Sequence, residues 1–503
     1  MLFQSFQFAA FLLCILCIFF FVPARGRIYV LAVANLVFFM AADPSAIIWL
    51  AFSVVSTHVC ACLVEKTESG WKKKAMVLSV LLLNLLLLAV FRYLPVWETL
   101  LNAAYGRGLR RFKFNLAGNW GLVAPLGISF YTLQALGYLL DVSAKKYPAE
   151  KNLLRYTVFV TFFPNITSGP IERGGHFLPQ LKRIGNQSRR QLLDYDRIVQ
   201  GAISMLWGFF LKMVVADRVS ILVDYLYGIY ENTDSFTMMM AAVFYSVQIY
   251  CDFASYSCIA SGAAKIMGFE LLPNFRQPYF AAGIRSFWDR WHMSLSGWFK
   301  DYVYIPLGGS RKGFLRRNLN VLFTFLVSGL WHGGAPQYLM WGLLHGSFQV
   351  LENCIEKLSG KWKIGGVHKW PAAVSFIWKG VHGLLTFAAV SCLWIFFRAE
   401  SVKVALVCLK NLFTKWQGFL YVKEFIFAMG LNKVEMFVAA VAVMIILFVD
   451  MISEWKKKEF AHWLYEAPYW FRAAFCMGLI AMIFVCGKYG VGYDPADFIY
   501  MQF

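Results

Sequence analysis

The chain has 503 residues, of which 59% are hydrophobic, 18% are aromatic and only 15% are charged. Soluble domains contain roughly 25% charged residues, and disordered chains are poor in aromatic residues, so the composition excludes both classes. The 11 cysteines are sparse for a disulfide-rich secreted scaffold. A polytopic membrane protein remains. Its net charge of +20 is typical of basic cytoplasmic loops facing anionic membrane lipid, and we expect no nucleic-acid partner.

Apolar runs that could cross a bilayer follow one another along most of the chain. They lie near 8–22, 28–42, 46–64, 75–91, 121–140, 199–216, 236–251, 318–331, 337–351, 376–397, 432–451 and 470–487. The shorter segments 153–166 and 255–268 are predicted to be re-entrant or broken helices, which are stable only when buried in protein. Because a span needs about 20 apolar residues, we expect an all-α fold with about 11–13 membrane-crossing or membrane-embedded helices.

Lysine and arginine in the first loops predict the orientation of the chain. Arg25 and Arg27 follow the first run, residues 41–46 contain no base, and Lys66 with Lys72–Lys74 follows the third run. Basic loops stay in the cytoplasm. The alternation therefore predicts that the N-terminus lies outside and that both basic loops lie in the cytoplasm.

Three of the eight histidines lie near tryptophans in the second half of the chain: His292, His332 and His345. His332 ends the apolar run Val321–Trp331, where an ionisable group is costly unless it is paired or reached by water. A neutral imidazole there can accept a proton, or it can be structural and bond a backbone carbonyl. The glycines after His332 allow close approach of backbone or ligand. His58, alone in a span, is predicted to be structural.

Other chemistries have weaker support in the sequence. No H-E-x-x-H and no paired C-x-x-C motif occurs, so we expect no metal site. Gly308–Gly313 looks like a phosphate loop but lacks the Walker spacing, which favours a basic turn between helices. Asp252, Glu172 and Arg173 are interpreted as structural hydrogen-bonding or ion-pairing groups.

In chain order, the motifs of this sequence resemble those of the membrane-bound O-acyltransferase (MBOAT) superfamily, most of all its bacterial alginate O-acetyltransferase branch. The matching segments include Pro125–Tyr131, Gly169–Ile171, Gln248–Phe253, Asn274–Tyr279, Phe287–Ser296, Asp301–Gly309, Ser328–Gly333, Phe397–Ala399 and Phe498–Phe503. The resemblance implies one transmembrane domain over 1–503, with core motifs at about 121–350 and C-terminal helices and a terminal motif over 376–503. The family's usual aspartate-phenylalanine-serine-glycine-tyrosine-serine-aspartate run differs here at Ala254, Ser255 and Cys258, and Asp289 replaces a usual arginine. Because both histidines are intact, these departures bear on substrate detail more than on activity.

The resemblance implies tilted helices around a tunnel through the membrane, with His332 as the catalytic histidine and His292 as its partner position. It also implies an acyl donor that enters from the cytoplasm and an acceptor on the other side. Acyl transfer to a hydroxyl needs a base for the O–H group and donors for the developing oxyanion. We assign His332 as the base, and His292 as the group that orients the donor or stabilises charge.

Two further sets of residues are assigned to the acyl donor. Trp288, Trp291 and Trp331 are expected to wall the tunnel and exclude water that would hydrolyse a thioester. The basic residues that follow Gly308-Gly309 are expected to attract the phosphates of coenzyme A. They are Arg311, Lys312, Arg316 and Arg317.

The terminal Phe498–Phe503 motif suggests a covalent role for Tyr500, because it resembles the C-terminal tyrosine motif of related wall-modifying acyltransferases. A phenol near pKa 10 is a better leaving group than an alkyl alcohol, so a tyrosyl ester stays activated for a second transfer. The alternative is an aromatic anchor at the membrane interface.

The leading interpretation is an O-acetyltransferase of the bacterial inner (plasma) membrane that passes acetyl groups from acetyl-CoA outward to a polysaccharide. An extracytoplasmic SGNH-type acetyltransferase is the expected partner, and membrane lipid surrounds the chain. D-alanyl transfer to teichoic acid from an acylated carrier protein is one alternative. A transporter or channel that uses buried histidines as a proton path is another.

Overall fold

The computed structural model describes residues 3–68, 70–105, 124–359, 372–416 and 430–489. These residues are largely helical and contain no strand. Their contacts divide the chain into two units, Met1–Ala202 with Ala260–Leu272, and Ile203–Ile259 with Pro273–Gln502. The all-α prediction is confirmed for the described residues, whereas the single domain over 1–503 stays a prediction.

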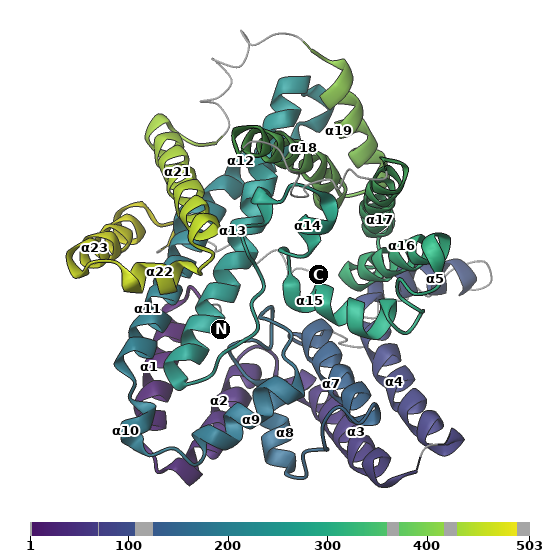
Figure 1. The fold of residues 1–503 in the computed structure, drawn as a ribbon, viewed down its shortest axis with the longest axis vertical. Helices are drawn as coiled ribbons and strands as arrows, with labels where there is room; N and C mark the ends of the chain where they lie inside the picture. The colour runs from purple at the N-terminus through teal and green to yellow at the C-terminus, as the bar shows by residue number, and fades with distance from the viewer. Residues whose placement is uncertain (1–2, 69, 106–123, 360–371, 417–429, 490–503) are drawn as a thin grey trace. The chain divides into compact units, whose positions relative to one another are not determined.

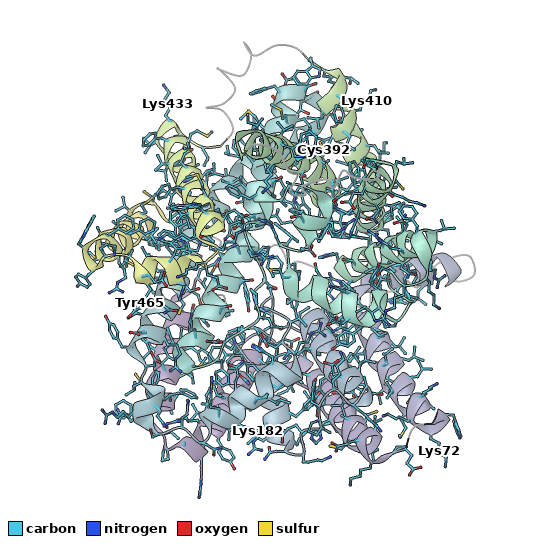
Figure 2. All side chains as sticks on the ribbon, in the orientation of Figure 1. Lys72, Lys182, Cys392, Lys410, Lys433 and Tyr465 are labelled. Carbon is cyan, nitrogen blue, oxygen red and sulfur yellow. The ribbon has the colours of Figure 1, made fainter. Side chains whose placement is uncertain are left out.

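The first unit combines helices that are long enough to cross a membrane with shorter ones (Figure 1). Its helices are α1 (Phe6–Phe21), α2 (Arg27–Met40), α3 (Ile47–Lys66), α4 (Trp71–Arg92), α5 (Leu94–Tyr105), α7 (Ile128–Ser143), α8 (Leu153–Thr161), α9 (Gly174–Ile184) and α10 (Arg189–Leu192). Helix α7 packs against α3 and α4 and is buried along nearly its whole length. Lys182, which Figure 2 labels, lies in the last turn of α9.

The second unit carries the remaining helices. They are α11 (Tyr195–Phe209) and α13 (Ser235–Met267), which also contribute residues to the first unit, α12 (Asp217–Gly228), α14 (Ile284–Trp288), α15 (Met293–Phe299), α16 (Gly313–His332), α17 (Pro336–Ser359), α18 (Ala372–Arg398), α19 (Val402–Thr414), α21 (Lys433–Lys456), α22 (Phe460–Glu466) and α23 (Tyr469–Cys486). Helices α16 and α17 lie side by side, and α17 packs on α18 (Figure 1).

Seven helices within the described ranges are long and apolar enough to cross a membrane. They cover Pro44–Lys66, Trp71–Arg92, Arg189–Gly228, Ser235–Met267, Ile377–Arg398, Lys433–Lys456 and Tyr469–Cys486. Helices α16 and α17 coincide with predicted runs, but polar side chains such as Asn320 and Glu352 lower their hydropathy. The wider number of 11–13, which includes embedded helices, stays a prediction.

Segment 255–268 differs from the sequence prediction, because it continues α13 without a break and does not form a separate short helix. Segment 153–166 is short as predicted: α8 ends at Thr161, and a run of turns follows it. Asn152 caps α8 by accepting from the backbone N–H of Arg155.

A buried lysine of the second unit is paired with two buried acids. A π-helical segment, Phe210–Ala216, places Lys212 with its Nζ 2.7 Å from Oδ1 of Asp252 and 3.0 Å from Oδ1 of Asp217. Opposite charges at these distances offset part of the cost of burying each ion. The interpretation of Asp252 as an ion-pairing group is therefore confirmed.

Two buried groups of the first unit also have structural partners. A ring nitrogen of His58, Nε2, lies 3.0 Å from the backbone oxygen of Glu150, as expected for a structural histidine. The carboxylate of Glu172 pairs with Nδ1 of His176 at 2.8 Å and accepts from the backbone N–H of Leu272.

Candidate active site

His332 lies at the C-terminal end of α16 and is only 2% exposed. The planes of three aromatic rings lie nearly perpendicular to the plane of its imidazole. Their centroids are 4.8 Å (Trp331), 5.0 Å (Trp341) and 5.1 Å (Phe397) from the imidazole centroid. Edge-to-face packing of this kind is favourable for aromatic rings. It also surrounds the imidazole of His332 with apolar surface.

Glycines let α16 and α17 pack closely beside His332. A Cβ on Gly329 would lie 2.4 Å from the carbonyl oxygen of Tyr338, and one on Gly342 would lie 2.3 Å from that of Phe325. Neither contact is possible without a shift of the backbone. These glycines of the two histidine motifs therefore serve the approach of helix to helix.

His292 lies in the turn before α15 and is 1% exposed. Its backbone is in the left-handed region, with φ +43° and ψ +54°, which is uncommon for a residue with a side chain. Its Nδ1 lies 3.3 Å from Oδ1 of Asn274, and Phe253 meets its ring at 90° with centroids 4.6 Å apart. A strained backbone held by buried contacts is frequent at functional sites.

The contacts of Asn274 determine which nitrogen of His292 carries the proton. Asn274 donates from Nδ2 to Oγ of Ser257 at 3.0 Å, so its oxygen faces His292 and accepts from Nδ1–H. In that tautomer, Nε2 is the basic nitrogen of the ring. Burial lowers the pKa of His292 to about 3, which keeps the ring neutral near pH 7.

Trp331 contacts both histidines. Its ring centroid lies 4.8 Å from that of His332 and 6.2 Å from that of His292. The two imidazoles therefore border one indole, although they come from segments 40 positions apart in the sequence.

The other two predicted tryptophans belong to the same aromatic cluster. Trp288 and Trp341 have ring centroids 5.6 Å apart, Trp291 and Trp394 lie 5.0 Å apart, and Trp341 stacks on Trp394 at 5.8 Å. The sequence gives no role to Trp341, although this residue opens the Trp341–Gly346 segment that contains His345. Its position one helical turn before His345 is the signal that could have identified it.

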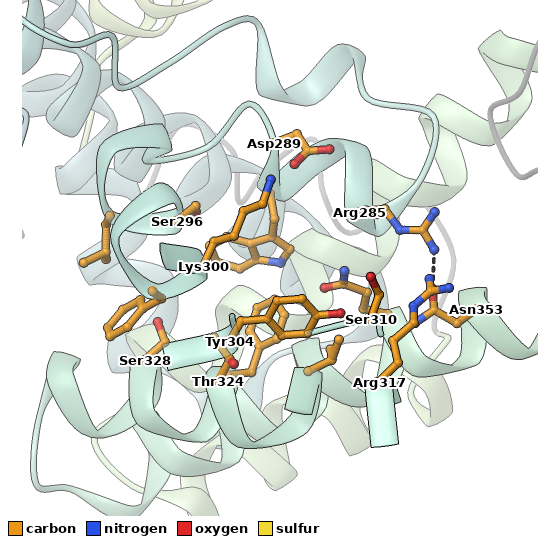
Figure 3. Close-up of a pocket in the computed structure, with 16 residues that line it drawn as sticks. Arg285, Asp289, Ser296, Lys300, Tyr304, Ser310, Arg317, Thr324, Ser328 and Asn353 are labelled. Atoms are coloured by element: carbon orange, nitrogen blue, oxygen red, sulfur yellow. Dashed lines mark hydrogen bonds between the residues drawn. The ribbon is translucent and has the colours of Figure 1, made fainter. Parts of the chain in front are cut away.

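A pocket of about 490 Å³ lies between α14, α15, α16 and α17 (Figure 3). Its walls combine aromatic, hydroxyl, amide and charged side chains. They are Arg285, Trp288, Asp289, Leu295, Ser296, Phe299, Lys300, Tyr304, Ser310, Arg317, Val321, Thr324, Phe325, Ser328, Gln349 and Asn353. Trp288 is the predicted tryptophan that lines this pocket, whereas His332 and His292 are not among its lining residues.

The residues that line this pocket include three cations and one acid, so we call it the electropositive pocket. The carboxylate of Glu352 lies beside it and accepts from the backbone N–H of Arg285 at 3.1 Å. Arg285 and Arg317 both donate to Oδ1 of Asn353 and point toward one another, while Lys300 reaches toward Asp289 (Figure 3). One neutral amide oxygen cannot neutralise two guanidinium groups. Arg285 also pairs with Glu356, at 3.1 Å. The remaining positive charge suits an anionic ligand.

The basic residues predicted from the sequence divide into two groups. Arg317 lines the pocket, whereas Arg311 and Lys312 are exposed and follow Ser310, which does line it. Arg285 and Lys300 were missed, because each is a single basic residue that lies just outside a matching segment. Their proximity depends on the tertiary packing of α14, α15 and α16.

Two sequence predictions concern groups outside this geometry. Tyr500 lies in 490–503, outside the described residues. Across the residues that the structure does describe, no group of three or more His, Cys, Asp or Glu side chains is placed to hold a metal ion.

The helices and the buried histidines together define a multi-pass membrane protein with an aromatic-walled candidate active site. A sequence model described as "MBOAT, membrane-bound O-acyltransferase family" matches residues 35–383. The chain therefore belongs to the membrane-bound O-acyltransferase family.

Several bacterial relatives are similar to this chain. The "Probable alginate O-acetylase AlgI" of Pseudomonas syringae pv. tomato is 33% identical over 325 residues, which are 64% of this chain and 58% of that protein. The "Peptidoglycan O-acetyltransferase" of Helicobacter pylori is 29% identical over 406 residues, 76% of this chain and 73% of that protein. The "Teichoic acid D-alanyltransferase" of Bacillus subtilis is 28% identical over 263 residues, 51% of this chain and 66% of that protein.

The similarity covers only part of these relatives. The matched region spans between 50% and 64% of the length of the alginate O-acetylases. The family of this chain follows from the sequence model that matches residues 35–383.

Proposed function

We propose that this chain is a membrane O-acyltransferase of the bacterial inner membrane. It moves an acetyl group from cytoplasmic acetyl-CoA toward hydroxyl groups of an extracytoplasmic polysaccharide. The observation that carries the proposal is the pair of buried imidazoles, His332 and His292, which both lie beside the ring of Trp331. Two relatives whose names state O-acetylation of alginate or peptidoglycan favour acetyl as the group that is transferred.

In the proposed mechanism, His332 removes the proton of the incoming hydroxyl as its oxygen attacks the thioester carbonyl. The C–O bond forms, the C–S bond breaks, and the proton passes from His332 to the leaving thiolate of coenzyme A. His292, held by Asn274, orients the donor or stabilises charge that develops on the carbonyl oxygen. The surrounding tryptophans exclude water from the thioester.

The electropositive pocket supports an acyl donor that carries phosphates. Arg285, Lys300 and Arg317 would bind these phosphates, and the exposed Arg311 and Lys312 would add long-range attraction. An extracytoplasmic SGNH-type acetyltransferase would complete delivery to the polymer. The single domain over 1–503 and the tunnel are part of the same proposal.

The experiment uses the purified full-length chain in nanodiscs with radiolabelled acetyl-CoA and a soluble hydroxyl acceptor. We expect transfer by the wild type, a loss of at least about 100-fold in His332→Ala, and a clear loss in His292→Ala. His462→Ala is the control, because His462 is an exposed histidine of α22. Full transfer by both His332→Ala and His292→Ala would contradict the assignment.

A second candidate is D-alanyl transfer from an acylated carrier protein, which the similarity to a teichoic acid D-alanyltransferase favours. Offering acetyl-CoA and a D-alanylated carrier protein in parallel separates the two functions. Transfer from the carrier protein alone would replace the acetyl proposal.

The carrier role of Tyr500 remains part of this proposal and has a test of its own. Mass spectrometry of the C-terminal peptide after exposure to acetyl-CoA should detect an added acetyl group on the tyrosine. An unmodified Tyr500 in an active preparation, together with full activity of Tyr500→Phe, would remove the covalent role and leave the aromatic anchor.

A further inference from the structure

His345 is a buried histidine to which the proposed mechanism assigns no role. It lies on α17 and is 0% exposed. Its Nδ1 accepts a hydrogen bond from the indole Nε1–H of Trp288 at 3.3 Å, and the two rings cross at 86° with centroids 5.0 Å apart. An indole nitrogen can only donate, so Nδ1 carries no proton. The ring is therefore neutral, with its proton on Nε2.

The bond to Trp288 is the polar contact that fixes this ring. Among the described residues, Nε2 of His345 has no hydrogen-bond partner. Aromatic rings also pack on the imidazole, including Trp341 at 5.1 Å and Trp394 at 5.8 Å between centroids.

Trp288 occupies two environments at once. It lines the electropositive pocket together with Arg285 and Arg317. It also meets Trp341 at 5.6 Å, and Trp341 meets His332 at 5.0 Å between centroids. The indole of Trp288 therefore stands between the pocket and the aromatic cluster around His332.

We infer that His345 is a positioning residue: its Nδ1 holds the indole of Trp288 in the orientation that forms this wall, and thereby sets how the acyl donor is presented to His332. The inference rests on the proposed function. Removing the acceptor would leave a buried indole N–H unsatisfied, and the ring would turn to find another partner. Because the pocket lies directly beside this ring, a turned indole would change the shape of the donor site.

Two substitutions at His345 separate its two nitrogens. In His345→Asn, the amide oxygen takes the place of Nδ1 and can still accept from Trp288. In His345→Gln, the amide group takes the place of Nε2, and the acceptor near Trp288 is lost. Trp288→Phe removes the donor while keeping an aromatic wall. Elution as a single species in detergent shows whether each variant is folded.

The first measurement is steady-state transfer with acetyl-CoA as donor. Trp288→Phe and His345→Gln should each raise the donor KM about 3- to 10-fold with less than a twofold change in kcat, as expected for one lost hydrogen bond. His345→Asn should remain within about twofold of the wild type, and the double variant Trp288→Phe/His345→Gln should be no worse than either single variant. Equal losses in His345→Asn and His345→Gln, or additive losses in the double variant, would overturn the inference.

The second measurement does not depend on activity. The chain contains 18 tryptophans, and labelling with 5-fluorotryptophan gives each of them a ¹⁹F resonance. The resonance that disappears in Trp288→Phe is assigned to Trp288. This resonance should shift in His345→Gln and keep its wild-type chemical shift in His345→Asn. An unchanged resonance in His345→Gln would contradict the positioning role. Failure of the wild type to transfer acyl groups would refute the proposed function and leave this readout intact.

Discussion

The side-chain oxygen of Asn274 accepts hydrogen bonds from Nδ1 of His292 at 3.3 Å and from Oγ of Ser294 at 2.6 Å. Its amide nitrogen is anchored on Ser257, so the carboxamide cannot flip without losing that bond. Asn274 therefore fixes both the tautomer and the ring orientation of His292. This relationship links the loop before the 3-10 helix Pro278–Phe280 to the turn before α15.

We expect Asn274→Ala to lower kcat/KM about 5- to 10-fold, because one oriented hydrogen bond to a neutral group is worth roughly 1 kcal/mol. Ser257→Ala is the comparison, since it removes the anchor of the amide nitrogen, whereas Ser294 still donates to the oxygen that faces His292. It should stay within about twofold of the wild type in the same acetyl-transfer assay. Equal losses in both variants would point to general loosening of the loop.

The close packing of α16 on α17 gives a prediction on stability. In Gly342→Ala, the new Cβ would meet the carbonyl oxygen of Phe325 at 2.3 Å, so the helices must separate. We expect a loss of about 1–3 kcal/mol in the free energy of unfolding, measured as a lower apparent Tm. Gly478→Ala on α23 is the control, because its Cβ meets no atom within 4 Å. There the better helix propensity of alanine should keep or raise the apparent Tm. Equal destabilisation by both variants would refute the packing argument.

Much of this fold could be predicted from apolar runs, because lipid forces a spanning backbone into helices whose length is visible in the sequence. The run at 432–451, for example, corresponds to α21 within a few residues. Segment 255–268 was misjudged because small and polar residues interrupt its hydropathy, while packing inside the protein keeps α13 continuous.

The candidate site was predicted only in part. Histidines and tryptophans inside motifs were visible, and Trp331 beside His332 follows from adjacency alone. The meeting of Arg285 and Arg317 at Oδ1 of Asn353 was not visible in the sequence. These residues come from three helices, and no local pattern encodes how those helices pack.

The buried ion triplet around Lys212 should be essential for folding. In Lys212→Met, the carboxylates of Asp217 and Asp252 lose the cation that lies 3.0 and 2.7 Å from them. Breaking a buried ion pair costs about 3–5 kcal/mol. We expect little folded protein in detergent, as judged by size-exclusion chromatography.

Lys265→Met provides the comparison for this triplet, because Lys265 donates to the neutral amide of Gln200 and its loss leaves no unpaired acid there. It should be recovered as a single folded species. Wild-type recovery of Lys212→Met would show that the triplet is dispensable.

The pair of His176 and Glu172 should make the first unit sensitive to pH. The hydrogen bond that Nδ1–H of His176 donates to the Glu172 carboxylate raises the pKa of His176 above its usual value near 6.5. A raised pKa in the folded state means that the pair stabilises the fold fully below pH 6.5 and loses this contribution as pH rises through the folded-state pKa. The apparent Tm of the wild type should therefore fall relative to that of His176→Gln between pH 6 and pH 8. Parallel pH profiles of the two proteins would contradict the prediction.

The cations that hold the donor can be ranked by paired substitutions. Lys300→Ala/Arg317→Ala removes two charges that line the pocket, and Arg311→Ala/Lys312→Ala removes two exposed charges from the neighbouring loop. If phosphates bind in the pocket, the first pair should raise the donor KM about 10-fold or more, since charged hydrogen bonds contribute about 1.5–3 kcal/mol each. The second pair acts only through screened attraction, so its smaller effect should vanish when the salt concentration is raised. A larger, salt-independent rise in KM for the loop pair would move the donor phosphates from the pocket to Arg311 and Lys312.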